Sequence, residues 1–149
     1  MAHDALTSAR NTLTAEAAGI TQLADALGDN FVQAVDVLAA AQGRVIVSGM
    51  GKSGHIGNKI AATMASTGTP ASFVHPAEAS HGDLGMITQD DVVLALSWSG
   101  GTQELASPLN YTTRFKIPLI AITSGADSLL GKAATICLTL PKAEEACPN

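Results

Sequence analysis

Val92-Val93-Leu94-Ala95-Leu96 is an unbroken apolar run inside a strand that we predict over residues 91–96. Such a strand is buried on both faces, which is typical of a parallel sheet covered by helices on either side. Similar short apolar runs predict further strands over residues 44–48, 71–74, 119–122 and 136–140. Helices are predicted over residues 55–67 and 103–115, the second strained or offset near Pro108. The sequence therefore predicts an α/β fold, a three-layer doubly wound five-stranded parallel sheet of order 2-1-3-4-5.

Two helices are predicted before the first strand. Between residues 4 and 27, Leu6, Leu13, Ile20 and Leu27 recur every seven positions, which indicates an amphipathic helix. This helix fits equally well on a neighbouring subunit or on the chain's own core. Residues 28–30 (GDN) end it, and a second helix runs to about Gln42. We predict one domain over residues 1–149, with N-terminal helices in residues 4–42 and the sheet in residues 43–149, and with no final helix to cover the sheet beside the fifth strand.

The composition excludes several classes of protein. Apolar residues make up 46% and charged residues 14%, which excludes a disordered chain. A net charge of −5 opposes nucleic acid and anionic membranes, and no apolar run approaches the roughly 18 residues of a membrane span. We expect a cytoplasmic protein with no nucleic-acid or membrane partner, in which Cys137 and Cys147 are reduced thiols.

Glycine-rich loops follow the first and third predicted strands. Residues 49–54 (GMGKSG) fit the G-x-G-x-x-G pattern of dinucleotide sites, but His75 stands where such a site needs an acidic residue. Glu78 lies slightly beyond, so a nicotinamide cofactor stays an alternative, whereas Ile46 excludes an ATP-type phosphate loop. Residues 97–102 (SWSGGT) offer hydroxyls, flexible glycines and the start of a helix, which suit a phosphate group. A serine-rich connection that only caps the helix is the alternative.

Several strings resemble the sugar isomerase (SIS) domains that bind phosphosugars, and within them the arabinose 5-phosphate isomerases. The strings are residues 49–57 (GMGKSGHIG), 65–70 (ASTGTP), 73–76 (FVHP), 81–86 (HGDLGM) and 142–148 (KAEEACP). The resemblance covers nearly the whole chain and implies a flavodoxin-like SIS domain. It also implies interconversion of D-ribulose 5-phosphate and D-arabinose 5-phosphate through an enediol, which supplies Kdo for lipopolysaccharide biosynthesis. No organic cofactor, an inhibitory zinc ion in some members, and a homotetramer or homodimer with active sites at subunit contacts are further implications.

The chain departs from this family in two places. The family's second loop commonly has the sequence Ser-Asn-Ser-Gly-Glu-Ser/Thr, and here Trp98 and Gly101 replace the Asn and the Glu. Members also continue past the Cys-Pro pair into a Thr/Ser-rich turn, a long helix with an active-site histidine and, at full length, paired CBS domains. We therefore expect a chain truncated at the C-terminus, without CBS domains. A non-catalytic phosphosugar-binding domain, serving as a sensor, stays the alternative function.

An aldose–ketose isomerase needs a base, a polarising group and a clamp for the non-reacting phosphate. We predict Glu104 as base, Lys52 as polarising group, His81 as proton relay and Glu145 as second acid or base. Each also has a plain structural interpretation, as a solvated lysine, a helix-terminal or surface glutamate, or a structural histidine. His81 is also a candidate metal ligand, because His75, Glu78 and His81 have the spacing of a weak metal cluster. The predicted contacts to a sugar phosphate are Ser53, Glu78, His81, Ser97, Ser99 and Thr102.

Overall fold

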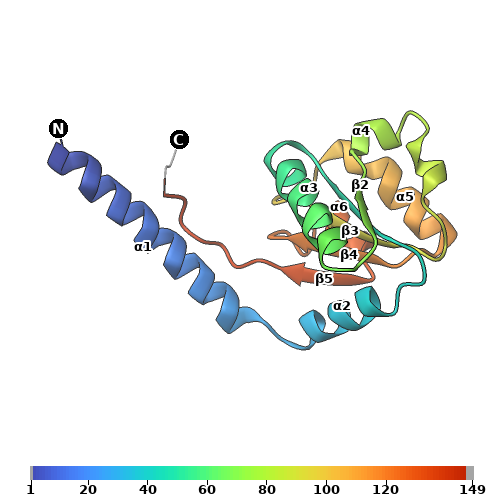
Figure 1. Cartoon of the computed structure of the whole chain (residues 1–149), viewed down its shortest axis with the longest axis horizontal. Coiled ribbons are helices and arrows are strands. Elements are labelled where there is room, and N and C mark those ends of the chain that lie inside the picture. Colours follow the sequence, from blue (N-terminus) through green and yellow to red (C-terminus); the bar gives the residue numbers. More distant parts are fainter. Residues whose placement is uncertain (1, 147–149) are drawn as a thin grey trace. The chain divides into compact units, whose positions relative to one another are not determined.

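The computed structural model describes residues 2–146, with side chains from Asp4 onward (Figure 1). The chain forms two compact units. One comprises residues 29–139 and contains the whole sheet, and the other combines the N-terminal segment up to Gly28 with the segment from Leu140.

The larger unit is built on a five-stranded parallel sheet, which confirms the predicted order, β2-β1-β3-β4-β5. The predicted strands are present, each within about a residue of its expected ends. They are β1 (Val45–Gly49), β2 (Ala71–Phe73), β3 (Val92–Leu96), β4 (Leu119–Thr123) and β5 (Ile136–Thr139). β1 and β3 lie side by side at the centre, and their last residues, Gly49 and Leu96, are register partners. The chain turns to opposite sides after these two strands, so their carboxyl ends form the switch point of the sheet.

The two faces of the sheet are covered by different helices, which gives three layers. Successive side chains of a strand point to opposite faces, so Val45 and Val47 join one hydrophobic cluster while Ile46 joins the other. The first cluster includes side chains of α2 (Asp29–Ala39) and α3 (Gly51–Ser66). The second includes side chains of α4 (Pro76–Ala79), α5 (Ala106–Phe115) and α6 (Leu129–Ala133).

Helix α2 covers the sheet beside its last strand, where we had expected no covering helix. It contacts β5, and Figure 1 shows it lying along that strand. Ala34 is 2% exposed in the cluster that also holds Ile136, and the Asn30 side chain donates a hydrogen bond to the Cys137 carbonyl at 3.4 Å. A helix from before β1 thus covers the sheet beside β5.

Helix α5 starts later than predicted because of Pro108. Residues Gln103–Leu105 form a short 3₁₀ turn, η2, and the α-helix begins only at Ala106. Proline lacks an N–H and its ring clashes with the carbonyl of the residue four positions earlier, here Glu104. Pro108 therefore lies in the first turn of α5, and Glu104 lies in η2 rather than in the first α-helical turn.

Asp91 ties the start of the central strands to the chain before β3. Its side chain is 2% exposed and accepts hydrogen bonds from the Arg44 amide at 2.6 Å and the Thr88 amide at 2.7 Å. Burial raises the pKa of this carboxyl, but the Thr88 and Arg44 amides, the Thr88 hydroxyl and the Arg44 charge outweigh burial and hold its pKa below the usual value. The carboxylate therefore stabilises the fold in its ionised form.

The smaller unit contains α1 (Ala2–Ala26) and the segment from Leu140. A Cβ at Gly19 would lie 3.4 Å from the Ala143 side chain, so this face of the helix carries the returning segment. The predicted apolar stripe is exposed, with relative exposures of 52–70% at Leu6, Leu13, Ile20 and Leu27.

Within residues 2–146, no helix combines the length and the apolar character that crossing a membrane requires. Cys137 is a free cysteine in the described part of the chain, and Cys147 lies outside the described residues, so the expectation of two reduced thiols stays a prediction.

Candidate functional site

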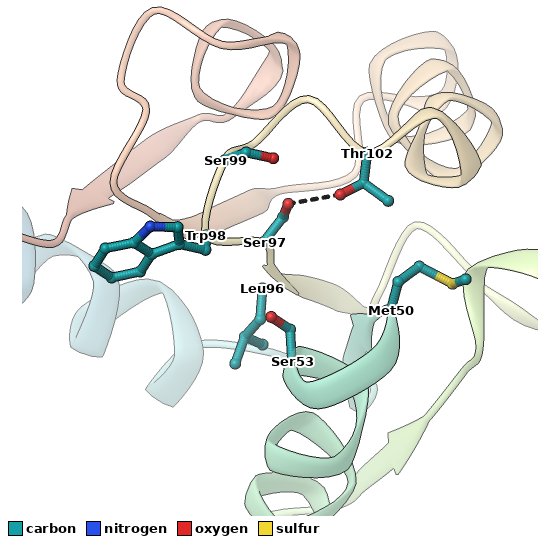
Figure 2. Close-up of a pocket in the computed structure, with 7 residues that line it drawn as sticks. All are labelled: Met50, Ser53, Leu96, Ser97, Trp98, Ser99 and Thr102. Carbon is teal, nitrogen blue, oxygen red and sulfur yellow. Dashed lines mark hydrogen bonds between the residues drawn. The ribbon is translucent and has the colours of Figure 1, made fainter. Parts of the chain in front are cut away.

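A pocket of about 290 Å³ lies at the switch point of the sheet. Figure 2 shows that hydroxyl groups from two loops gather there, with larger apolar side chains around them. The first loop connects β1 to α3, and the second connects β3 to η2. The pocket is lined by Met50, Ser53, Leu96, Ser97, Trp98, Ser99 and Thr102. The prediction that both glycine-rich loops open on one crevice is therefore confirmed.

The second loop, residues 97–102, is held by hydrogen bonds among its own residues. The Ser97 hydroxyl lies 2.9 Å from the Thr102 hydroxyl, and the two share a hydrogen bond (Figure 2). The Gly100 amide donates to the Ser97 hydroxyl at 3.1 Å, and the Gly101 amide donates to the Ser99 hydroxyl at 3.3 Å. Ser97 is 5% exposed, so it acts mainly as the inner support of the loop. Ser99 is exposed and Thr102 half-buried, and their hydroxyls line the pocket.

The chain after β4 supports this loop from behind. The Trp98 carbonyl accepts hydrogen bonds from the Ser124 amide at 3.0 Å, the Ser124 hydroxyl at 2.8 Å and the Thr123 hydroxyl at 3.1 Å. The Gly100 carbonyl accepts from the Leu130 amide at 3.0 Å. A loop held by this many main-chain bonds is a rigid frame for its exposed side chains.

Gly100 is required by this packing. Its φ is +65°, a conformation that favours glycine, and a Cβ there would overlap the Ser128 hydroxyl. That hydroxyl is already engaged, because it caps α6 by accepting from the Gly131 amide at 3.1 Å and donates to the Gly125 carbonyl at 2.5 Å. The second loop and the cap of α6 therefore fit together only if residue 100 has no side chain.

The first loop sets the start of α3 against the sheet. Gly51 opens the helix with a φ of +54°, and Lys52 and Ser53 lie in its first turn. A Cβ at Gly54 would lie 2.6 Å from the Gly49 carbonyl oxygen, so the helix approaches β1 as closely as glycine allows. This close approach places the Ser53 hydroxyl opposite the second loop (Figure 2).

The structure thus brings together four of the predicted contact residues, and the others lie elsewhere. Lys52 is exposed in the first turn of α3, next in sequence to the pocket residue Ser53. Glu104 is exposed in η2, two residues after the pocket residue Thr102. Glu78 is exposed near the end of α4. His81 is exposed in the turn that follows, and its amide donates a hydrogen bond to the Glu78 carbonyl at 2.9 Å. Glu145 is exposed in the segment that belongs with α1. Their catalytic and contact roles stay predictions.

No group of three or more His, Cys, Asp or Glu side chains within the described part of the chain is arranged to hold a metal ion. His75, Glu78 and His81 therefore do not form the three-ligand cluster that their spacing indicated. A metal contact by His81 alone stays a prediction.

Sequence reasoning missed two kinds of residue. Met50 and Leu96 supply apolar pocket wall, although both directly flank the glycines and serines that were recognised. Thr123, Ser124 and Ser128 hold the second loop in place from more than twenty positions away. The serine and glycine in residues 124–128 (SGADS) were a turn signal, and Ser128 before an apolar pair was a helix-cap signal.

The arrangement is suited to a small anion with a carbon substituent. Serine and threonine hydroxyls can each donate a hydrogen bond to an oxyanion, and bonds to a charged acceptor are about twice as strong as neutral ones. The N-terminal end of α3, which carries the partial positive charge of the helix, lies at the same pocket through Met50 and Ser53. The apolar wall leaves room for carbon atoms next to the anion.

The chain is similar to proteins of known name. The chain is 54% identical over 145 residues to the arabinose 5-phosphate isomerase KdsD of Pseudomonas aeruginosa, and 50% identical over 148 residues to the arabinose 5-phosphate isomerase GutQ of Escherichia coli K12. These alignments cover 97% and 99% of this chain but only 44% and 46% of the relatives, so the chain spans less than half their length.

Solved structures give the same fold. A protein of Escherichia coli CFT073 in complex with A5P superposes with a TM-score of 0.92 at 37% identity, covering 97% of this chain and 77% of that one. A putative sugar-phosphate isomerase from Listeria monocytogenes superposes with a TM-score of 0.91 at 28% identity, covering 96% and 75% of the two chains. The model of the SIS domain family matches residues 38–148, which include every pocket residue. By this match over most of its length, the chain belongs to the SIS domain family.

Proposed function

We propose that this chain binds D-arabinose 5-phosphate and D-ribulose 5-phosphate and interconverts them as an aldose–ketose isomerase. The observation that carries the proposal is the pocket at the carboxyl ends of β1 and β3, where Ser53, Ser97, Ser99 and Thr102 present hydroxyls to one small cavity. Support for the sugar comes from relatives that are 50–54% identical and are named arabinose 5-phosphate isomerases. An anion clamp for the phosphate leaves the other end of a pentose free to react.

The reaction moves one proton between neighbouring carbons. A base removes the proton from carbon 2 of the aldose, and the carbonyl oxygen at carbon 1 takes up a proton to give the enediol. Protonation at carbon 1, with loss of the proton from the hydroxyl at carbon 2, then yields the ketose. We assign the base to Glu104, which follows the phosphate loop by two residues. Lys52, adjacent to the pocket residue Ser53, balances the negative charge on the oxygens. His81 relays protons between the oxygens, and Glu145 is the second acid or base.

No organic cofactor is needed, because oxidation at carbon 2 is balanced by reduction at carbon 1 of the same substrate, and zinc bound by His81 would act as an inhibitor. We propose a homotetramer or homodimer, supported by the exposed apolar stripe of α1, since exposed side chains of this size commonly mark protein contacts. A cytoplasmic location and a role in supplying Kdo for lipopolysaccharide complete the proposal.

The test is proton exchange with solvent. In deuterated water, the protein should incorporate deuterium at carbon 2 of D-arabinose 5-phosphate, detected by NMR. A Lys52→Ala, Glu104→Gln double variant should lose at least about 10²-fold in rate, the usual contribution of a positioned base. Lys59→Ala is the matched control, because Lys59 is exposed on α3 and its amine bonds Thr63 at 3.1 Å instead of facing the pocket. Incorporation no faster than in the double variant would disprove the isomerase.

A non-catalytic phosphosugar-binding domain is the second candidate. The observation that favours it is that the pocket residues are suited to binding alone, while Lys52, His81 and Glu104 do not line the cavity. This function predicts calorimetric binding of D-arabinose 5-phosphate without deuterium incorporation. Turnover by this chain would exclude it.

A further inference from the structure

The Trp98 indole is an exposed apolar surface at the rim of the phosphate pocket. It is the chain's single tryptophan, it lines the pocket, and its side chain is 49% exposed. In Figure 2 the indole and the Met50 side chain lie on opposite sides of the hydroxyls. Because an indole is large and mostly apolar, a half-exposed one beside a binding cavity offers a ligand an apolar surface to pack on.

The indole is not what holds the loop. The main chain of Trp98 is fixed by the bonds that its carbonyl accepts from Thr123 and Ser124. The inner support of the loop comes from the Ser97 hydroxyl, which bonds Gly100 and Thr102. Any side chain at position 98 could occupy the same frame, so the choice of tryptophan is free to serve the ligand.

The pocket wall has two chemically different parts. Hydroxyls of Ser53, Ser99 and Thr102 suit the oxygens of a phosphate group, whereas Met50, Leu96 and Trp98 offer it no charged partner. An inorganic phosphate ion consists only of oxygens around phosphorus, and it gains nothing from apolar wall. A phosphate monoester carries carbon atoms directly beyond one oxygen, and their C–H groups can pack on an indole face.

We propose that Trp98 is a specificity-determining residue that makes this site prefer phosphate monoesters of polyhydroxylated carbon chains over free phosphate. The proposal rests on the proposed sugar-phosphate function and adds to it the group that discriminates. Contact with the first carbons of the ester would remove roughly 50 Å² of apolar surface from water, which corresponds to about a five- to tenfold gain in affinity. That gain applies to the ester alone.

Calorimetry with two probes tests the proposal. D-arabinose 5-phosphate and inorganic phosphate are titrated into the wild-type protein and into Trp98→Ala, Trp98→Phe and Phe115→Ala. Trp98→Ala should weaken the ester about five- to tenfold and leave inorganic phosphate within about twofold, and Trp98→Phe should restore most of the loss. Phe115→Ala is the matched control, since Phe115 is a half-exposed aromatic residue on α5 outside the pocket, and it should change neither affinity.

Fluorescence of the single tryptophan gives an independent measurement. The ester should shift or quench the emission of the wild-type protein at saturation, and inorganic phosphate should change it far less. Equal losses of both probes in Trp98→Ala would mean that the indole supports the loop, and no loss of either would mean that it does not touch the ligand. An emission already blue-shifted and unresponsive would mean that protein covers the indole. Each of these three results overturns the proposal while the proposed function stands, whereas a wild-type protein that binds neither probe refutes the proposed function itself.

Discussion

The substitution Gly100→Ala adds a single methyl group, but it should lower the free energy of unfolding by more than such a small change usually does. Residue 100 has a φ of +65°, which costs an alanine about 1–2 kcal/mol. The new Cβ would overlap the Ser128 hydroxyl and lie 2.7 Å from the Ser128 Cβ, so Ser128 must move and the cap of α6 is lost, at a cost of about 1 kcal/mol. The expected loss in free energy of unfolding is therefore about 2–3 kcal/mol.

Substitutions at two other glycines of the pocket loops separate these contributions. Gly51→Ala meets no atom within 4 Å but has a φ of +54°, so it should cost only the conformational part, about 1–2 kcal/mol. Gly101→Ala meets only the Ser99 hydroxyl at 4.0 Å, and it should be close to neutral. Urea unfolding followed by circular dichroism gives the three free energies. Calorimetry with inorganic phosphate should show a loss of about tenfold in Gly100→Ala alone, equivalent to one hydrogen bond to the anion.

A double-variant cycle with Ser128→Gly identifies the cause. This change removes the two Ser128 atoms that the new Cβ would strike and leaves the Thr123 hydroxyl, which would lie 2.9 Å from that Cβ. Glycine at a helix cap costs only a few tenths of a kcal/mol. Gly100→Ala combined with Ser128→Gly should therefore be less destabilised than the sum of the two, by about 1 kcal/mol. If the two effects simply add, or if Gly100→Ala is no worse than Gly101→Ala, the packing of the loop on α6 does not restrict residue 100 and the reasoning is refuted.

Three further predictions address the sheet and the pocket. Asp91→Asn should lower the free energy of unfolding by about 1–3 kcal/mol in urea titrations, because amides of Arg44 and Thr88 lose a charged acceptor. The pKa of Asp91 is lowered in the fold, so its stabilisation is present above the ordinary value of 3.8 and disappears as the pH falls through the lower, folded-state pKa; a wild-type protein no more acid-sensitive than Asp91→Asn would contradict this. Gly54→Ala should cost about 1–3 kcal/mol by pushing α3 from the Gly49 carbonyl, with Gly85→Ala, which meets no atom within 4 Å, as the neutral comparison. Thr102→Val should weaken inorganic phosphate about tenfold by calorimetry, whereas Thr113→Val, whose hydroxyl bonds the Leu109 carbonyl on α5, should leave binding intact.

The sheet was predictable because its signals are local. Each strand is a short apolar run, and residues such as Val92 and Leu96 lie in a pattern that only burial on both faces explains. The order of strands and the meeting of two loops then follow from chain connectivity. The helices α4 and α6 span four and five residues, too few to show a helical period, and they were not predicted.

The site was predictable only in part, because its support is not local. Ser53, Ser97, Ser99 and Thr102 carry their chemistry in their own side chains, and the structure places them together. The contact between Gly100 and Ser128 joins positions that no sequence period connects. Equal spacing of His75, Glu78 and His81 likewise did not predict a metal cluster, because spacing along the chain does not fix the directions of the side chains.

The support of the second loop by the chain after β4 separates what the loop must keep from what it can vary. Main-chain bonds fix the path of the loop, and residue 100 is restricted to glycine. Positions 98 and 101 are exposed, and no side chain at either position takes part in the bonds that fix the loop. A library that randomises these two positions should therefore yield folded proteins that differ in which phosphorylated compounds they accept, which makes the loop a natural starting point for redirecting this scaffold toward new ligands.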